Sequence, residues 1–131
     1  MAEEFEVSRK KIPFMEHNGI EICSIERDHS ILKANVTEVS KNPYGMIHGG
    51  LLYTMMDCSA GIAARTDNNN YVTQNVYVNY LSNVRDEEAV YAEGTVIRRG
   101  KSITVVHVIA RTEDGMLLAD GTVNMFRISG K

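Results

Sequence analysis

The chain has 131 residues, of which 44% are hydrophobic and 24% are charged, and its formal net charge is -3. This length suits one domain, and this balance excludes a disordered chain. The 14 lysines and arginines are outnumbered by 17 acidic residues, so no broad positive field exists to attract nucleic acid. The acidic amino terminus and the lack of a long apolar run predict a cytoplasmic protein without a signal peptide or a membrane span.

No linker, charge block or internal repeat divides the sequence, so we expect a single domain over residues 1–131. Residues 3 to about 16 mix charged and apolar side chains in a pattern that predicts a short amphipathic helix. Asn18 and Gly19 then mark a turn. Two runs of alternating polarity follow, over residues 20 to about 27 and 31 to about 39, which predicts two strands joined by a tight turn.

A glycine-rich loop and a helix occupy the centre of the chain. Residues 40–50 include Pro43, Gly45 and the pair Gly49 and Gly50, a composition typical of a loop. Residues 51–64 are apolar or small on every side, with Asp57 as the only charge. A helix of this kind is expected to be surrounded by protein rather than to lie on a surface.

The last half of the chain predicts four strands, over residues 71–81, 89–98, 102–112 and 116–128. Asp114 and Gly115 give the last two a hairpin turn. The connections between the later strands are too short for parallel crossovers. The economical solution is one curved antiparallel sheet wrapped around one long helix, which is an α+β fold.

The glycine pair after His48 is the first candidate site. Glycines allow unusual backbone conformations and the close approach of a ligand to the main chain. The first amides of a helix lack intrahelical partners and lie at the positive end of its dipole, where they suit a developing oxyanion. A tight turn without any function explains the same residues equally well.

Asp57 is the second candidate, because a carboxylate among apolar neighbours must be paired, hydrated or functional. A structural hydrogen bond to a neighbouring loop is the alternative. Asp57 lies nine residues after His48, so the two are about 13 Å apart along a helix axis and on opposite sides of it. They share a site only if a second chain supplies one of them, with two helices antiparallel across a twofold axis. A working site therefore predicts a dimer.

Other residue types give weaker signals. The remaining histidines and the two cysteines lack the spacing of metal ligands, so no metal is expected, and Cys58 is interpreted as inert packing. The turn over residues 98–101 is either a solvated connection or a small anchor for phosphate groups, since three cations flank Gly100.

The set Asn42, His48, Gly49, Gly50 and Asp57 resembles the motif of the hotdog-fold acyl-CoA thioesterases, in particular the branch that contains the phenylacetate-pathway thioesterase. The spacing agrees at every position, and the likeness runs from about Phe14 to Phe126. The resemblance implies a hotdog fold and the hydrolysis of an acyl-CoA, with coenzyme A as part of the substrate and no further cofactor.

The resemblance also implies roles for single residues. Asp57 would act as general base or nucleophile, and the Gly49 amide would polarise the thioester carbonyl. Asn42 and His48 would orient water or the loop, and Thr73 matches a hydroxyl that the family uses opposite the acid. The family assembles this site between two chains, and many members pair two such dimers into tetramers.

The chain departs from the family after Leu81. Many members have Arg-Pro there, whereas this chain has Ser82 and Asn83, so a cation for the nucleotide end of coenzyme A is missing. Arg99 and Lys101, on either side of Gly100, are the candidates to replace this cation. Gly50 is expected to be a further contact of the substrate. The alternative function is a non-catalytic acyl-CoA-binding sensor or interaction module of the same fold, and a thiol-release assay separates the two.

Overall fold

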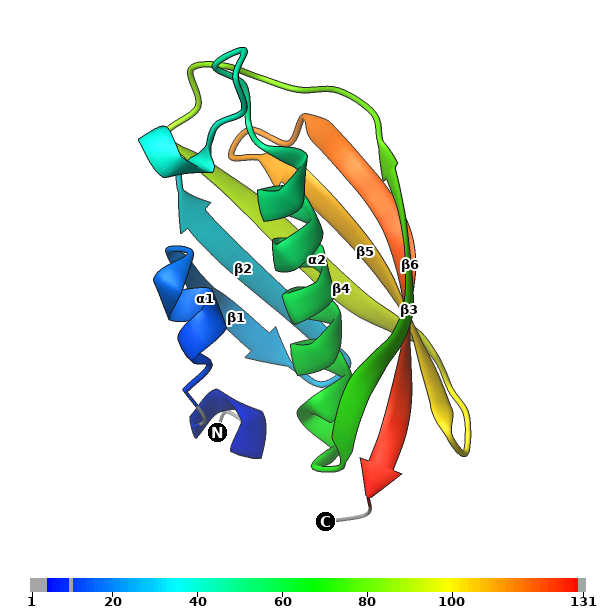
Figure 1. Ribbon diagram of the computed structural model, residues 1–131. Coiled ribbons are helices and arrows are strands. Elements are labelled where there is room, and N and C mark those ends of the chain that lie inside the picture. Colours follow the sequence, from blue (N-terminus) through cyan, green and yellow to red (C-terminus); the bar gives the residue numbers. More distant parts are fainter. Residues whose placement is uncertain (1–4, 10, 130–131) are drawn as a thin grey trace.

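In the part of the chain that the structure describes, six strands form one antiparallel sheet around a long helix. The computed structural model describes residues 5–9 and 11–129. The sheet order is β1-β2-β4-β5-β6-β3, and helix α2 (Gly49–Ala64) lies along the concave face of the sheet (Figure 1). The predicted α+β fold with a curved sheet around one helix is confirmed. The strands are β1 (Ile20–Glu26), β2 (His29–Asn35), β3 (Asn70–Tyr80), β4 (Ala89–Arg99), β5 (Ile103–Thr112) and β6 (Leu117–Ser129).

The amino-terminal segment forms two short helical pieces rather than one helix. They are the 3-10 helix η1 (Glu6–Arg9) and the helix α1 (Pro13–His17). Proline suits the first position of α1, because its fixed φ fits a helix and it has no amide to leave unpaired. Residues 3, 4 and 10 of the predicted helix lie outside the described residues. Gly19, at a φ of +70°, confirms the turn before β1.

The second predicted strand is shorter than expected. β2 ends at Asn35, and the chain then turns through the 3-10 helix η2 (Glu38–Ser40). The Ser40 hydroxyl accepts a hydrogen bond from the Thr37 amide at 3.1 Å, as part of a capping box. These local side-chain bonds compete with the sheet, so the prediction of a strand to about residue 39 is wrong.

Helix α2 buries one face completely and leaves part of another open. Leu52, Met55, Met56 and Ile62 are fully buried against the sheet. In the first half of the helix, however, Gly50 and Tyr53 are exposed and Asp57 is only half-buried. The expectation that protein surrounds the helix is therefore wrong for the isolated chain. We call Gly50, Tyr53 and Asp57 the open stripe of α2. Among the described residues, no second layer covers the side of α2 that faces away from the sheet (Figure 1).

Strand β3 borders α2 and forms one edge of the sheet. Within the described part of the chain, β3 pairs with β6 alone, and most of its residues beyond Tyr71 are exposed. The pairing of β3 with β6 shifts register between Thr73 and Asn75, as a β-bulge does. A long exposed edge of this kind is a surface on which another strand can pair.

No helix among residues 5–9 and 11–129 is both long and apolar enough to cross a membrane.

Candidate active site

Two asparagines hold the loop that leads into α2. The Asn42 side-chain oxygen accepts hydrogen bonds from the amides of Tyr44 at 2.9 Å and Met46 at 3.1 Å. Asn83 accepts from the Ile47 amide at 3.2 Å and donates to the Ile47 carbonyl at 3.0 Å. Asn42 thus orients the loop through its own side chain. Asn83, which the sequence marked only as a departure from the family, supports the same loop from the segment that follows β3.

His48 caps α2 with its ring. Nδ1 accepts a hydrogen bond from the Gly50 amide at 2.8 Å, which requires a neutral ring that carries its proton on Nε2. A Cβ atom at Gly50 would lie 3.0 Å from that same nitrogen. Glycine therefore lets the ring close over the first turn, and the Gly50 amide is already occupied.

Gly49 contributes an amide that, among the described residues, donates to no acceptor. The Tyr80 hydroxyl donates to the Gly49 carbonyl at 2.8 Å, and the Tyr80 ring lies 3.3 Å from where a Cβ atom would stand. Neither Gly49 nor Gly50 has a positive φ. The pair is needed for close approach by two aromatic rings, and the expected unusual backbone conformation is not found.

The alternation of β3 predicted a strand that includes Tyr80, but it gave no sign of the contact with Gly49. Tyr80 and His48 bind opposite ends of the peptide group between Gly49 and Gly50. Hydrogen bonds in series polarise one another and hold their members in place. This chain of bonds fixes the first turn of α2 and with it the direction of the Gly49 amide.

Asp57 and Thr73 meet on the open side of α2. The Thr73 hydroxyl donates to Asp57 Oδ1 at 2.6 Å, so the hydroxyl and the carboxylate are in direct contact within one chain. Asp57 and Gly49 do not meet within the chain. They are eight residues apart in one helix, or about 12 Å along its axis.

Arg99 has several partners at the other end of α2. Its guanidinium bonds Asp28 at 2.8 Å, Asp67 at 2.9 Å and the Ala63 carbonyl at 3.2 Å. Burial alone would raise the pKa of Asp67, but hydrogen bonds from Tyr71 and Asn69 and the charge of Arg99 outweigh it and lower that pKa. Arg99 thus joins β4 to the end of the helix.

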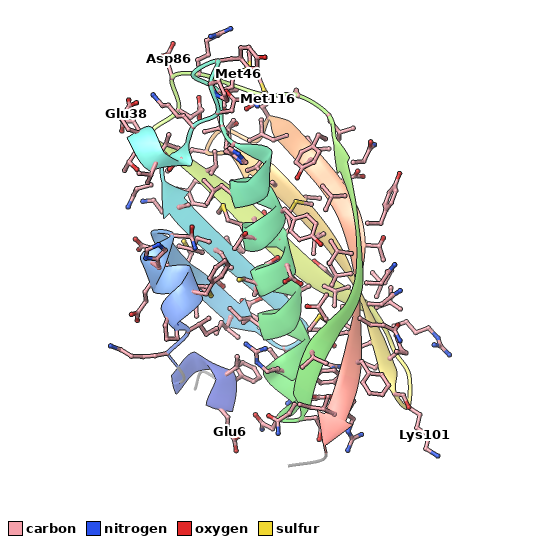
Figure 2. All side chains as sticks on the ribbon, viewed as in Figure 1. Glu6, Glu38, Met46, Asp86, Lys101 and Met116 are labelled. Atoms are coloured by element: carbon pink, nitrogen blue, oxygen red, sulfur yellow. The ribbon has the colours of Figure 1, made fainter. Side chains whose placement is uncertain are left out.

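The other residues of the expected phosphate anchor belong to the β4–β5 turn. The Gly100 amide donates to the Ile103 carbonyl at 2.8 Å, which closes the turn. Figure 2 shows Lys101 at the opposite end of the molecule from Met46, with its side chain directed away from the body. A role of Arg99, Gly100 and Lys101 in binding coenzyme A stays a prediction.

Two open cavities flank the start of α2. One, of about 340 Å³, is lined by Gly49 and Tyr80, and the other, of about 480 Å³, is lined by His48 and Gly50. The first also includes Asn42, Ile47, Leu52, Leu81, Ser82 and Asn83, and the second His17, Asn18, Val39, Ser40 and Leu51.

Cys58, on α2, and Arg65, at the end of α2, both have shifted pKa values. Burial, together with the charge of Asp57, raises the pKa of the Cys58 thiol to about 11, which agrees with inert packing. Burial lowers the pKa of Arg65. Over the part of the chain that the structure describes, no group of three or more histidine, cysteine or acidic side chains is placed to hold a metal.

This architecture is the hotdog fold. The family model of the thioesterase superfamily matches residues 44–119, and the chain belongs to that superfamily. That range holds the glycine pair, Asp57, Thr73 and Tyr80. Membership supports thioester hydrolysis as the general class of reaction.

Solved structures agree with this assignment. The PaaI protein of the E. coli phenylacetic acid degradation operon is 19% identical, has a TM-score of 0.88, and the alignment covers 95% of this chain and 90% of that one. A Streptococcus mutans protein bound to acetyl CoA is 26% identical, with a TM-score of 0.80 and coverage of 86% and 90%. A hypothetical thioesterase protein from Streptococcus pneumoniae, solved with coenzyme A, is 25% identical, with a TM-score of 0.79 and the same coverage.

Proposed function

We propose that the protein hydrolyses an acyl-CoA thioester to a free acid and coenzyme A, at a site that two chains complete. The observation that carries this proposal is the hydrogen bond between Thr73 and Asp57 on the open side of α2, in which the Thr73 hydroxyl lies 2.6 Å from Asp57 Oδ1. The amide of Gly49, which has no acceptor among the described residues, supplies the second feature that such a reaction needs.

Relatives of the chain support the substrate and the pair. Proteins of Streptococcus mutans and Streptococcus pneumoniae were solved with acetyl CoA and coenzyme A. Two solved variants of the hypothetical thioesterase protein of Streptococcus pneumoniae each replace one residue by alanine, an aspartate in one and a threonine in the other. The two positions are sixteen residues apart, which is the separation of Asp57 and Thr73.

In the proposed reaction, Asp57 takes a proton from water as the water attacks the thioester carbon, while Thr73 holds the carboxylate in place. The Gly49 amide, at the positive end of α2, stabilises the oxygen that becomes negative. The carbon–sulfur bond then breaks, and the thiolate of coenzyme A takes the proton back from Asp57. In the alternative, Asp57 itself attacks the carbon, and water hydrolyses the anhydride that forms.

The second chain is needed because Asp57 and Gly49 lie apart within one chain. We propose that two α2 helices run antiparallel across a twofold axis, so that Asp57 of the partner subunit lies beside Gly49. This arrangement covers the open stripe of α2 and brings the two β3 edges together. We also propose that two such dimers associate into a tetramer.

The test is release of free thiol from a panel of acyl-CoAs that differ in length and aromaticity. We expect turnover by the wild-type chain and a loss of about 10²- to 10⁴-fold in kcat for Asp57→Asn. Binding of acyl-CoA without thiol release would favour the non-catalytic sensor. Full activity in a protein that sedimentation shows to be a monomer would overturn the two-chain site.

A further inference from the structure

Arg65 places a second charged group on the same side of α2 as Asp57. It follows the last residue of the helix, and its side chain is half-buried. The guanidinium forms no hydrogen bond or ion pair with any residue in the described ranges 5–9 and 11–129. The charge of Asp57 acts on this guanidinium without a direct contact. A cation that is partly withdrawn from water and has no hydrogen-bonded partner is well suited to bind an anion.

Gly61 provides the space that this side chain uses. Arg65 runs back toward the start of the helix, as helical side chains do, and its Nη1 lies 3.2 Å from where a Cβ atom on Gly61 would stand. Gly61 is four residues beyond Asp57, on the same face of α2. Cβ positions one turn apart, such as those of residues 57 and 61, are about 5–6 Å from each other, so the guanidinium lies about one helical turn beyond Asp57.

We propose that Arg65 binds a carboxylate at the far end of the acyl group, so that the preferred substrates are thioesters of short dicarboxylic acids. This inference rests on the proposed function, because it places the reacting carbonyl next to Asp57. At about 1.5 Å for each carbon–carbon bond, roughly two to four methylene groups span the distance from the carbonyl to the guanidinium.

A phosphate of coenzyme A fits this place less well. The pantetheine arm separates the sulfur from the phosphates by a chain several times longer than one helical turn. Asp57 and Arg65 also belong to the same helix region, so their spacing does not depend on how a partner chain docks. A group bound to both must therefore be short.

The experiment compares glutaryl-CoA with valeryl-CoA, which has the same chain length but no second carboxylate. In the wild-type protein, we expect kcat/KM to be higher for glutaryl-CoA. Arg65→Gln should lower kcat/KM for glutaryl-CoA by about 10- to 100-fold and change the value for valeryl-CoA by less than about twofold. Arg65→Lys should keep part of the preference, because the charge remains.

Two further variants distinguish a specific effect on substrate preference from a general loss of folding. Gly61→Ala leaves the charge in place but puts a methyl group where Nη1 now packs, and alanine favours the helix. We expect it to reduce the preference for glutaryl-CoA in a folded protein. Arg127→Gln, at an exposed position of β6, is the matched control, and kcat/KM should stay unchanged for both substrates.

Each result has one meaning. Turnover of valeryl-CoA without a preference for glutaryl-CoA, or an equal loss for both substrates in Arg65→Gln, overturns the inference and leaves the proposed function standing. A loss in Arg65→Gln that disappears when acyl-pantetheine replaces acyl-CoA assigns Arg65 to a phosphate and also overturns it. Release of thiol from neither substrate, nor from the wider panel, overturns the proposed function itself.

Discussion

Tyr80 and His48 bind one peptide group from opposite sides. The Tyr80 hydroxyl donates to the Gly49 carbonyl at 2.8 Å, and His48 Nδ1 accepts from the amide of the next residue, Gly50, also at 2.8 Å. The plane of this peptide group sets the direction of the neighbouring Gly49 amide. The proposed oxyanion donor is therefore positioned by two side chains that need not touch the substrate.

Tyr80→Phe removes one of these bonds and keeps the ring over Gly49. A typical hydrogen bond contributes about 1 kcal/mol, so we expect kcat for thiol release to fall about 5-fold. Tyr77→Phe on the outer face of the same strand, where the side chain is exposed, is the control and should leave kcat unchanged. Equal kcat values for wild type and Tyr80→Phe would show that the second bond, to His48, suffices.

Thr73→Val tests the hydroxyl beside Asp57 without changing the shape of the side chain. Its loss removes the donor at 2.6 Å from the carboxylate, so we expect kcat to fall by about tenfold or more, since a hydrogen bond to a charged group is worth about 1.5–3 kcal/mol. Thr73→Ser keeps the hydroxyl and should retain most of the activity. A serine variant as slow as the valine variant would instead point to packing of the methyl group.

Arg99→Leu should destabilise the fold. The variant leaves Asp28, Asp67 and the Ala63 carbonyl without their shared donor, and charged hydrogen bonds of this kind contribute about 1.5–3 kcal/mol. Urea unfolding gives the free energy of unfolding, with exposed Arg127→Leu as the control. If Arg99→Leu is as stable as the control yet binds coenzyme A more weakly, the phosphate anchor is the better assignment.

Acid should weaken the fold through Asp67 and Glu93. The pKa of Glu93 is also lowered: burial opposes this change, but hydrogen bonds from Arg111 and His29 outweigh it. A carboxyl whose pKa is lower when folded adds stability that is complete above its ordinary pKa and is lost as the pH falls through the folded value. We therefore expect the free energy of unfolding to fall on acidification from about pH 4 downward.

Asp67→Asn supplies the check on this pH dependence. The variant cannot gain or lose the proton at that position, so its free energy of unfolding should change less between pH 5 and pH 3 than that of the wild-type protein. Urea unfolding at each pH measures this difference. An equal change in both proteins would place the acid sensitivity elsewhere.

Much of this fold could be predicted because local signals and the global arrangement agree. The alternating runs gave the strands, and the apolar segment over residues 51–64 gave α2. The apolar composition of α2 indicates that most of its surface is buried, but it does not show whether the same chain or a second chain buries it. The prediction of an enclosed helix was wrong for that reason, and in the proposed dimer the partner chain supplies the missing cover.

The site could be predicted in part. The motif spacing marked Gly49 and Asp57, and the resemblance to the family added Thr73, whose hydroxyl contacts Asp57 in the structure. Tyr80 and the partners of Arg99 could not be found, because their contacts join segments far apart in the chain. Periodicity gives the face on which a side chain lies, but it does not say which residue of another element stands opposite.

The bulge in β3 has a consequence for how the site is aligned. Thr73 and Tyr80 are seven residues apart, so in a regular strand they would point to opposite faces. Gln74 has no cross-strand partner in the pairing with β6, and this one additional residue turns both side chains toward α2. Deleting Gln74 would turn either the Thr73 hydroxyl or the Tyr80 ring to the outer face of the sheet. This unpaired residue therefore keeps both ends of the site on the same face of β3.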